Sequence, residues 1–292
     1  MHIQKEDLNE LEFPELLAEI SPFAYSPKTA EKIEKLRPLP IDEAEISLKK
    51  VAEYLSSFES ENPIPFDEYE DIETELKLMM IENFRLENSA FIKIKSLTEQ
   101  IGKLQKFFPP FEDLFLNLNN DVKDLDYRKE VIDKIDKVFN RFGEVKSEAS
   151  PILKTLRTEI QHARKAIQEN FNRTLTALSS TDFLDDIRES IIDDQRVLAV
   201  KSGYKKRVSG RVLGVSKTGS ITYIQPESVV KHQFKLKENL EEEKKEVDKI
   251  LRKLTAEIAE FQPQLSDYQN YIFDLDLARA KAKFAEKVGG VL

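Results

Sequence analysis

The sequence predicts a mainly α fold, in which a helical core bundle carries a long antiparallel coiled coil with a small antiparallel β module at its tip. Charged residues make up 34% of the 292 residues, against only 8 glycines and no tryptophan, which is typical of long, surface-rich helices. Two segments repeat apolar residues at steps of three and four, the spacing of a seam between paired helices. Between these segments the pattern changes to a step of two, which indicates strands.

The first 125 residues are expected to form a bundle of short helices. Apolar residues recur there at roughly helical spacing, and prolines mark where helices begin and end. Ser26-Pro27 has the composition of a helix start, whereas Pro38, Pro40 and the pair Pro109-Pro110 end helices. The expected helices cover residues 7–20, the stretch after Pro27, and residues 41–58, 67–82 and 90–108.

Longer helices are expected after residue 125. Residues 131, 135, 138 and 142 continue a helical pattern that Gly143 caps, and Ser150-Pro151 starts the next helix. The first seam consists of Leu153, Leu156, Ile160, Ala163, Ile167, Phe171, Leu175 and Leu178. The second consists of Leu236, Leu240, Val247, Ile250, Leu254, Ile258, Phe261 and Leu265. Two narrow seams separated by a break indicate two antiparallel arms.

The segment between the arms is expected to form the β module. Half of the glycines lie there, namely Gly203, Gly210, Gly214 and Gly219. Residues 197–201, 211–216 and 220–225 read as three strands, and residues 217–220 read as a hairpin turn. The chain therefore divides into a helical core (1–125), ascending helices (126–192), the β module (193–235), a descending helix (236–265) and a return to the core (266–292).

The charge of this segment differs from that of the rest of the chain. The formal net charge is −9 at pH 7, yet residues 196–237 contain ten basic residues and a single acid, Glu227. Their net charge of +9 leaves −18 for the remainder. A solubilising surface usually mixes both signs, so the excess favours contact with a polyanion over mere solubility of an exposed tip.

The candidate nucleic-acid contacts come from this basic segment. They are Lys201, Tyr204, Lys205, Lys206, Arg207, Arg211, Lys217 and Lys231. Tyr204 lies in a predicted loop and is the preferred aromatic contact, whereas Tyr223 and Phe234 are expected in the core. No residue pattern indicates readout of particular bases.

Catalysis by this chain is not expected. The acid pairs Asp185-Asp186 and Asp193-Asp194 read as solvated or helix-terminal acids, since one pair makes no metal site. His162 is expected on a helix surface, and His232 is expected to add to the basic segment; neither has metal-site spacing. The sequence contains no G-x-x-x-x-G-K-[ST] phosphate loop and no cysteine. A polar N-terminus (1–9) and the lack of a long apolar stretch predict a cytoplasmic protein without a membrane segment.

Several motifs resemble the second bacterial branch of the MutS superfamily, the MutS-II branch. Residues 11–17 resemble the family's N-terminal entry helix, and residues 142–145 and 149–151 resemble the stretch that leads into its lever helix. Residues 276–282 resemble the segment that returns to the core. The most specific likeness consists of residues 194–201, 210–212 and 219–226 in the family's order and spacing. The resemblance implies that the paired helices form a lever and that the β module is a clamp that closes around a duplex.

The resemblance also implies features that lie outside this chain. The family carries an ATPase, which uses ATP and Mg, and usually a small nuclease domain; both would begin after Leu292. Full-length members are expected to be homodimers that act on duplex or branched DNA or on ribosomes. We therefore expect a non-catalytic segment, without a cofactor of its own, that grips DNA through phosphates. The alternative is a coiled-coil scaffold that docks ribosomal RNA or an acidic protein, and a carboxylate-metal nuclease ranks third.

Overall fold

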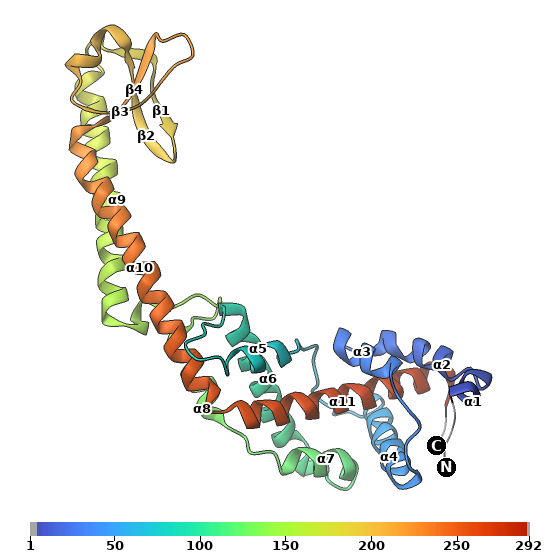
Figure 1. Cartoon of the computed structure of the whole chain (residues 1–292). Helices are drawn as coiled ribbons and strands as arrows, with labels where there is room; N and C mark the ends of the chain where they lie inside the picture. The colour runs from blue at the N-terminus through green and yellow to red at the C-terminus, as the bar shows by residue number, and fades with distance from the viewer. Residues whose placement is uncertain (1–4, 291–292) are drawn as a thin grey trace. The chain divides into compact units, whose positions relative to one another are not determined.

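The computed structural model describes residues 5–290 and confirms the mainly α fold with a small antiparallel sheet (Figure 1). The start of the polar N-terminal segment (1–4) and the end at Leu292 lie outside the described residues. The chain divides into two compact units. The helical unit contains the residues up to Lys146 and those from Leu251 onward, and the sheet unit contains Ser147–Ile250.

The helical unit is built around one long helix, α11. Its elements are α1 (Lys5–Glu10), α2 (Phe13–Ile20), η1 (Ser21–Phe23), α3 (Pro27–Glu34), α4 (Ile41–Phe58), α5 (Glu73–Leu78), α6 (Asn88–Phe107), η2 (Pro109–Phe111), α7 (Leu116–Lys123), α8 (Lys129–Val138) and α11 (Gln262–Val288). Helices α2 to α7 all contact α11, which buries side chains along its whole length, from Leu265 to Ala282. The mostly short helices therefore share one core.

A buried carboxylate joins the ends of the chain within this unit. Asp276 of α11 is completely buried and accepts hydrogen bonds from the backbone N–H groups of Tyr25 (3.0 Å) and Ser26 (3.2 Å). Burial raises the pKa of Asp276, while these two hydrogen bonds lower it. Ser26 in turn caps α3 through its hydroxyl, as the Ser26-Pro27 pair predicts.

Three predicted helices of this unit are shorter or broken. The expected helix at 7–20 is interrupted before α2, where Glu12 has φ 53°. Of residues 67–82 only α5 is helical, because the Gln269 side chain accepts the Ile72 N–H (2.8 Å) and Asp71 accepts the Glu73 N–H. The helix predicted to run to Phe142 ends at Val138, and the chain turns there instead.

The sheet unit begins with a long helix and ends with another. Its elements are η3 (Ser147–Ala149), α9 (Pro151–Leu178), β1 (Leu184–Ile192), β2 (Gln195–Lys201), η4 (Ser202–Arg207), β3 (Gly210–Val215), β4 (Ile221–Pro226) and α10 (Glu227–Ala259), whose last residues belong to the helical unit. Ser150 caps α9 by accepting the Leu153 N–H (3.0 Å), as predicted. The four strands are antiparallel in the order β1-β2-β4-β3.

Strand β1 is a correction to the sequence analysis. Residues 184–192 lie in the range predicted as ascending helices, because Leu184, Ile187 and Ile191 recur at the helical steps of three and four. Asp193 and Asp194 both have positive φ, 47° and 57°, and form the two-residue turn that pairs β1 with β2. Helix α10 also starts within the range predicted for the β module, so the sheet spans 184–226.

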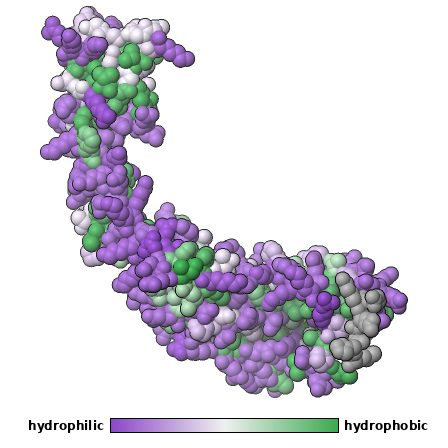
Figure 2. Space-filling model, viewed as in Figure 1, coloured by the Kyte–Doolittle hydropathy of each residue, from purple (hydrophilic) through white to green (hydrophobic). Residues whose placement is uncertain are grey.

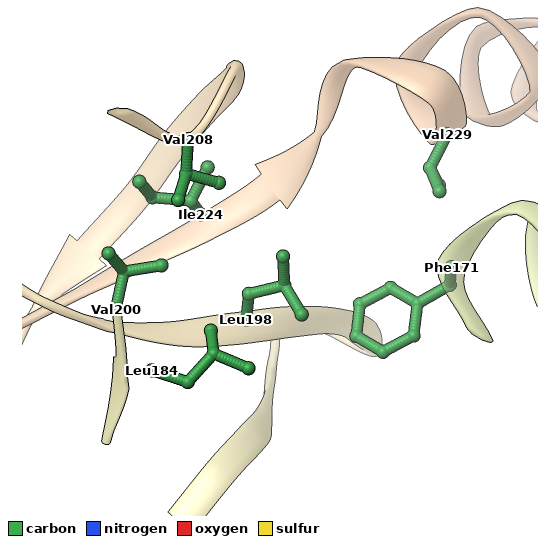
Figure 3. Close-up of a cluster of buried hydrophobic side chains, with 7 residues drawn as sticks. All are labelled: Phe171, Leu184, Leu198, Val200, Val208, Ile224 and Val229. Carbon is green, nitrogen blue, oxygen red and sulfur yellow. The ribbon is translucent and has the colours of Figure 1, made fainter. Parts of the chain in front are cut away.

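One face of the sheet packs against the helices of its own unit. Leu198 and Val200 of β2 point to the same face as Ile224 of β4, and Phe171 of α9 packs against them (Figure 3). Val229, in the first turn of α10, completes this core. Residues two apart on β2 share a face, so Leu198 and Val200 turn together toward this core, while Val197 and Ala199, which are also buried, lie on the other face.

Helices α9 and α10 lie side by side and antiparallel within the sheet unit (Figure 1). Near the sheet, the hydroxyls of Thr174 and Ser228 are 3.1 Å apart. At the other end of α9, the Ser150 hydroxyl donates to Glu246 of α10 (2.7 Å). Polar contacts thus accompany the apolar seam of α9.

The second predicted seam does not lie on one helix. Helix α10 ends at Ala259, and Leu265 belongs to α11. Pro263 occupies the first turn of α11, a position that proline favours because that turn needs no N–H donor.

Among residues 5–290, none of the helices combines the length and the apolar character that a membrane crossing requires.

Candidate nucleic-acid interface

The short helix η4 begins at the end of the sheet where the β3–β4 turn lies, and the chain then runs back toward the other end, where the Ser209 carbonyl accepts the Glu227 N–H (3.1 Å). The Ser202 N–H donates to the Ser220 carbonyl (2.8 Å), and the Ser202 hydroxyl donates to the Gly219 carbonyl (2.7 Å). Gly219 has φ 72°, which favours glycine, and the turn forms where the sequence predicts it. These contacts bring Lys217 to the end of β2 at which Lys201 lies.

Apolar contacts hold η4 against the sheet. The Tyr204 ring stacks on Phe183, with ring centroids 5.0 Å apart and planes at 29°. Val208, directly after η4, is buried in the core of the sheet unit. Tyr204 still exposes 39% of its surface, so it anchors η4 and remains accessible.

Six of the predicted contacts lie on η4 and at the end of the sheet where η4 begins. This basic cluster consists of Lys201, Tyr204, Lys205, Lys206, Arg207 and Lys217, all exposed. None of its five cations forms an ion pair or a side-chain hydrogen bond with any residue in the range 5–290. Unpaired, hydrated cations on a short helix and a turn are suited to bind phosphate groups, because no internal bond must be broken first.

Two other basic residues of the segment are already paired. Arg196 donates to Glu189, and its guanidinium lies 4.2 Å from the centroid of the Phe171 ring. Lys235 contacts Glu238 (3.4 Å) and Glu159 (3.6 Å), and the hydrogen bond to Glu238 raises its pKa. These two cations stabilise the unit itself, and neither was predicted as a contact.

The remaining two predicted contacts lie on β3 and on α10. Arg211 pairs with Gln225 near the end of β4, and Lys231 lies in the first turns of α10. Both are exposed and, like the cluster, form no ion pair among the described residues. The sheet register places Arg211 toward the end opposite Lys201, the end of β4 from which α10 starts.

The aromatic predictions have mixed outcomes. Tyr223 is half-buried on β4, whereas Phe234, expected in the core, exposes 60% of its surface. The reason is that α10 already begins at Glu227, so Phe234 is a helix residue on a face that α9 does not cover. Figure 2 shows hydrophobic surface next to hydrophilic surface in this unit.

The acid pairs and the histidines singled out in the sequence lie on separate elements of the described chain. Asp185 and Asp186 belong to β1, and Asp193-Asp194 forms the tight turn described above, so neither pair ends a helix. His162 is exposed on α9, as predicted, and His232 is half-buried on α10. Within residues 5–290, no three His, Cys, Asp or Glu side chains are close enough to hold a metal ion.

Comparison with known proteins gives relatives over nearly the whole chain. No family model matches the sequence. The chain is 26% identical over 291 residues to the protein named Endonuclease MutS2 of Aquifex aeolicus (strain VF5), covering 99% of this chain and 38% of that protein. It is 26% identical over 290 residues to the Putative endonuclease MutS2 of Bacillus subtilis (strain 168), and 24% identical over 298 residues to the Endonuclease MutS2 of Halothermothrix orenii. The chain spans 37–38% of the length of these relatives.

Proposed function

We propose that this chain is the core, lever and clamp portion of a protein of the MutS-II branch, and that its basic cluster grips the phosphates of duplex or branched DNA. The observation that carries the proposal is the set of five unpaired cations on η4, on the β3–β4 turn and at the end of β2. The similarity to proteins named MutS2 over 99% of the chain supports the assignment to this portion.

Binding through the basic cluster requires no catalytic group. Each lysine or arginine that contacts a phosphate releases condensed counterions, so affinity falls steeply as salt rises. The contacts position a duplex without reading its sequence, because they address the backbone and not the base edges. Tyr204, packed on Phe183, offers a hydroxyl for a sugar or phosphate next to these cations.

The remaining parts of the proposal concern the whole protein. Helices α9 and α10 would transmit to the clamp the motion that an ATPase produces with ATP and Mg. Their polar contacts, such as the pair Arg157–Glu243 (2.7 Å), can exchange partners during such a motion at lower cost than an apolar seam. A homodimer in the cytoplasm is the proposed setting.

The test is a salt titration of duplex binding with a triple variant. Lys205→Ala, Lys206→Ala and Arg207→Ala together should weaken binding at low salt and reduce the slope of log K against log salt by up to about 3, since each phosphate contact contributes about 0.9. The matched control is Lys49→Ala, Lys106→Ala and Lys137→Ala, three exposed lysines of the helical unit, and should change neither quantity. Unchanged affinity and slope in the first variant would defeat the proposal.

The same assay identifies the polyanion. Unlabelled duplex DNA, branched DNA and ribosomal particles are added as competitors over the salt series. We expect DNA to displace the labelled duplex. Displacement by ribosomal particles alone would instead favour the scaffold that docks ribosomal RNA.

A further inference from the structure

A groove in the sheet unit lies beside the candidate interface and is not part of the basic cluster. It has a volume of about 400 Å³ and lies between the sheet and the first turns of α10. Its walls combine three glutamines, two cations, one aromatic ring and three aliphatic side chains: Gln195, Gln225, Gln233, Arg211, Lys237, Phe234, Val230, Leu236 and Leu240. We call it the amide groove.

The α10 wall of the groove is a face that α9 leaves free. Gln233, Phe234 and Lys237 lie within about one turn of each other on α10. Helix α9 contacts other positions of α10, among them Ser228 and Glu243. An aromatic ring that exposes 60% of its surface, on a face of α10 that borders the groove, is available for a ligand.

The sheet wall supplies fixed hydrogen-bonding groups. Gln225 is almost completely buried, and its amide nitrogen donates to the Gln195 side-chain oxygen (2.7 Å). This bond leaves the Gln195 amide nitrogen with both hydrogens free, and Gln233 bonds to no other group among the described residues. The groove thus presents both donors and acceptors beside an aromatic face.

The charge of the groove favours an anionic ligand. Arg211 and Lys237 are exposed and form no ion pair among the described residues, and none of the residues that line the groove is acidic. An apolar peptide helix would need a continuous apolar surface, which the glutamines interrupt. A nucleotide matches all three features, since it has a π face, a hydrogen-bonding edge and a phosphate.

The position of the groove suits a single nucleic-acid strand that continues beyond the end of a duplex. Gln195 of the groove is the first residue of β2 and Lys201 of the basic cluster is the last, whereas Arg211 of the groove follows Arg207 of the cluster by only four residues. Seven strand residues span roughly 20 Å, which corresponds to about six base pairs of DNA.

We infer that the amide groove holds one unpaired nucleotide of a nucleic acid whose paired part contacts the basic cluster. Phe234 stacks on the base, the glutamine amides bond to its edge, and Arg211 and Lys237 bind the flanking phosphates. This inference rests on the proposed function and adds to it a preference for a duplex with an unpaired extension.

The experiment compares two probes. One is a blunt duplex of about two helical turns, and the other is the same duplex with a single-stranded extension of about eight nucleotides that carries 2-aminopurine. The intact chain should bind the extended probe about tenfold more tightly, and stacking on Phe234 should quench the 2-aminopurine fluorescence. Phe234→Ala should lose both effects and keep its affinity for the blunt duplex.

Two control variants test whether the aromatic ring of Phe234 causes the preference for the extended probe. Phe234→Tyr keeps an aromatic face and should keep the preference, and Val215→Ala, an exposed residue of β3 outside the groove, should change nothing. Equal affinity of the intact chain for both probes, or an unchanged preference in Phe234→Ala, would overturn the inference. If blunt-duplex binding still depends on Lys205, Lys206 and Arg207, the proposed function stands without the groove; if neither probe binds, both fail.

Discussion

The helical unit and the sheet unit use their cations differently. In the helical unit, Lys93 contacts Glu70 (3.1 Å) and Glu75 (3.5 Å), and Lys95 contacts Asp136 (2.6 Å) and Glu99 (3.6 Å). In the sheet unit, the five cations of the basic cluster form no such pair with any described residue. The difference arises from the sequence, since the helical unit interleaves acids with bases and the segment 196–237 contains a single acid.

This comparison distinguishes cations that form ion pairs within the fold from cations that remain available to bind a ligand. A cation held by two carboxylates is partly neutralised before any ligand arrives. A cation without a partner keeps its full field, so it gains more from a phosphate, whose condensed counterions it releases. The candidate interface is therefore marked by several unpaired cations in one stretch of chain that contains no acid, Lys201 to Lys217.

The largest expected effect is a loss of stability of the sheet unit. Phe171→Ala removes the ring that packs against Leu198 in the core of that unit (Figure 3). The free energy of unfolding should fall by about 3–5 kcal/mol, the range for large buried aromatic residues. Urea denaturation followed by circular dichroism measures the loss, and duplex binding should fall with it. A variant that keeps both stability and binding would show that this core does not position the cluster.

A second substitution loosens the helical unit alone. Asp276→Ala leaves the N–H groups of Tyr25 and Ser26 without their acceptor, at a cost of about 2–3 kcal/mol. The thermal midpoint should fall, while duplex affinity below that midpoint stays unchanged because the basic cluster is intact. Weakened binding by the folded variant would contradict the assignment of binding to the sheet unit.

The smallest expected effect concerns an exposed pair. Hydrogen bonds from Lys28 and Lys77 lower the pKa of Glu73 to about 2. Because the folded-state pKa lies below the ordinary value of 4.5, this contribution is present above pH 4.5 and is lost as pH falls toward 2. Glu73→Gln should therefore cost less than about 1 kcal/mol at pH 7, after solvent screening, and still less near pH 3. A difference in thermal midpoint between Glu73→Gln and the unchanged chain that stays constant from pH 7 to pH 3 would contradict the assignment of this stability to the ionised Glu73.

Local chemistry predicted much of the fold. The helix at 41–58 matches α4, and Ser26-Pro27 and Ser150-Pro151 start α3 and α9, because caps and prolines act within a few residues. Strand β1 was missed, since Leu184, Ile187 and Ile191 imitate helical spacing. The Asp193-Asp194 turn was the available signal.

The site was predictable in part. The charge asymmetry identified the basic segment, but sequence could not separate the paired Arg196 and Lys235 from the free cations, because their partners depend on the packing of β1 and α9. The groove around Phe234 was missed because it joins residues from three strands and a helix. The expected core role of Phe234 depended on where α10 begins.

The most direct test of the central claim is a lysine-acetylation footprint with and without duplex DNA. Lys201, Lys205, Lys206 and Lys217 should react readily in the free protein, being exposed and unpaired, and should be protected by the duplex. Lys93 and Lys95, each held by two carboxylates, should react slowly and show no change on adding DNA. Protection confined to the helical unit, or no protection of the four lysines at saturating duplex, would contradict the account.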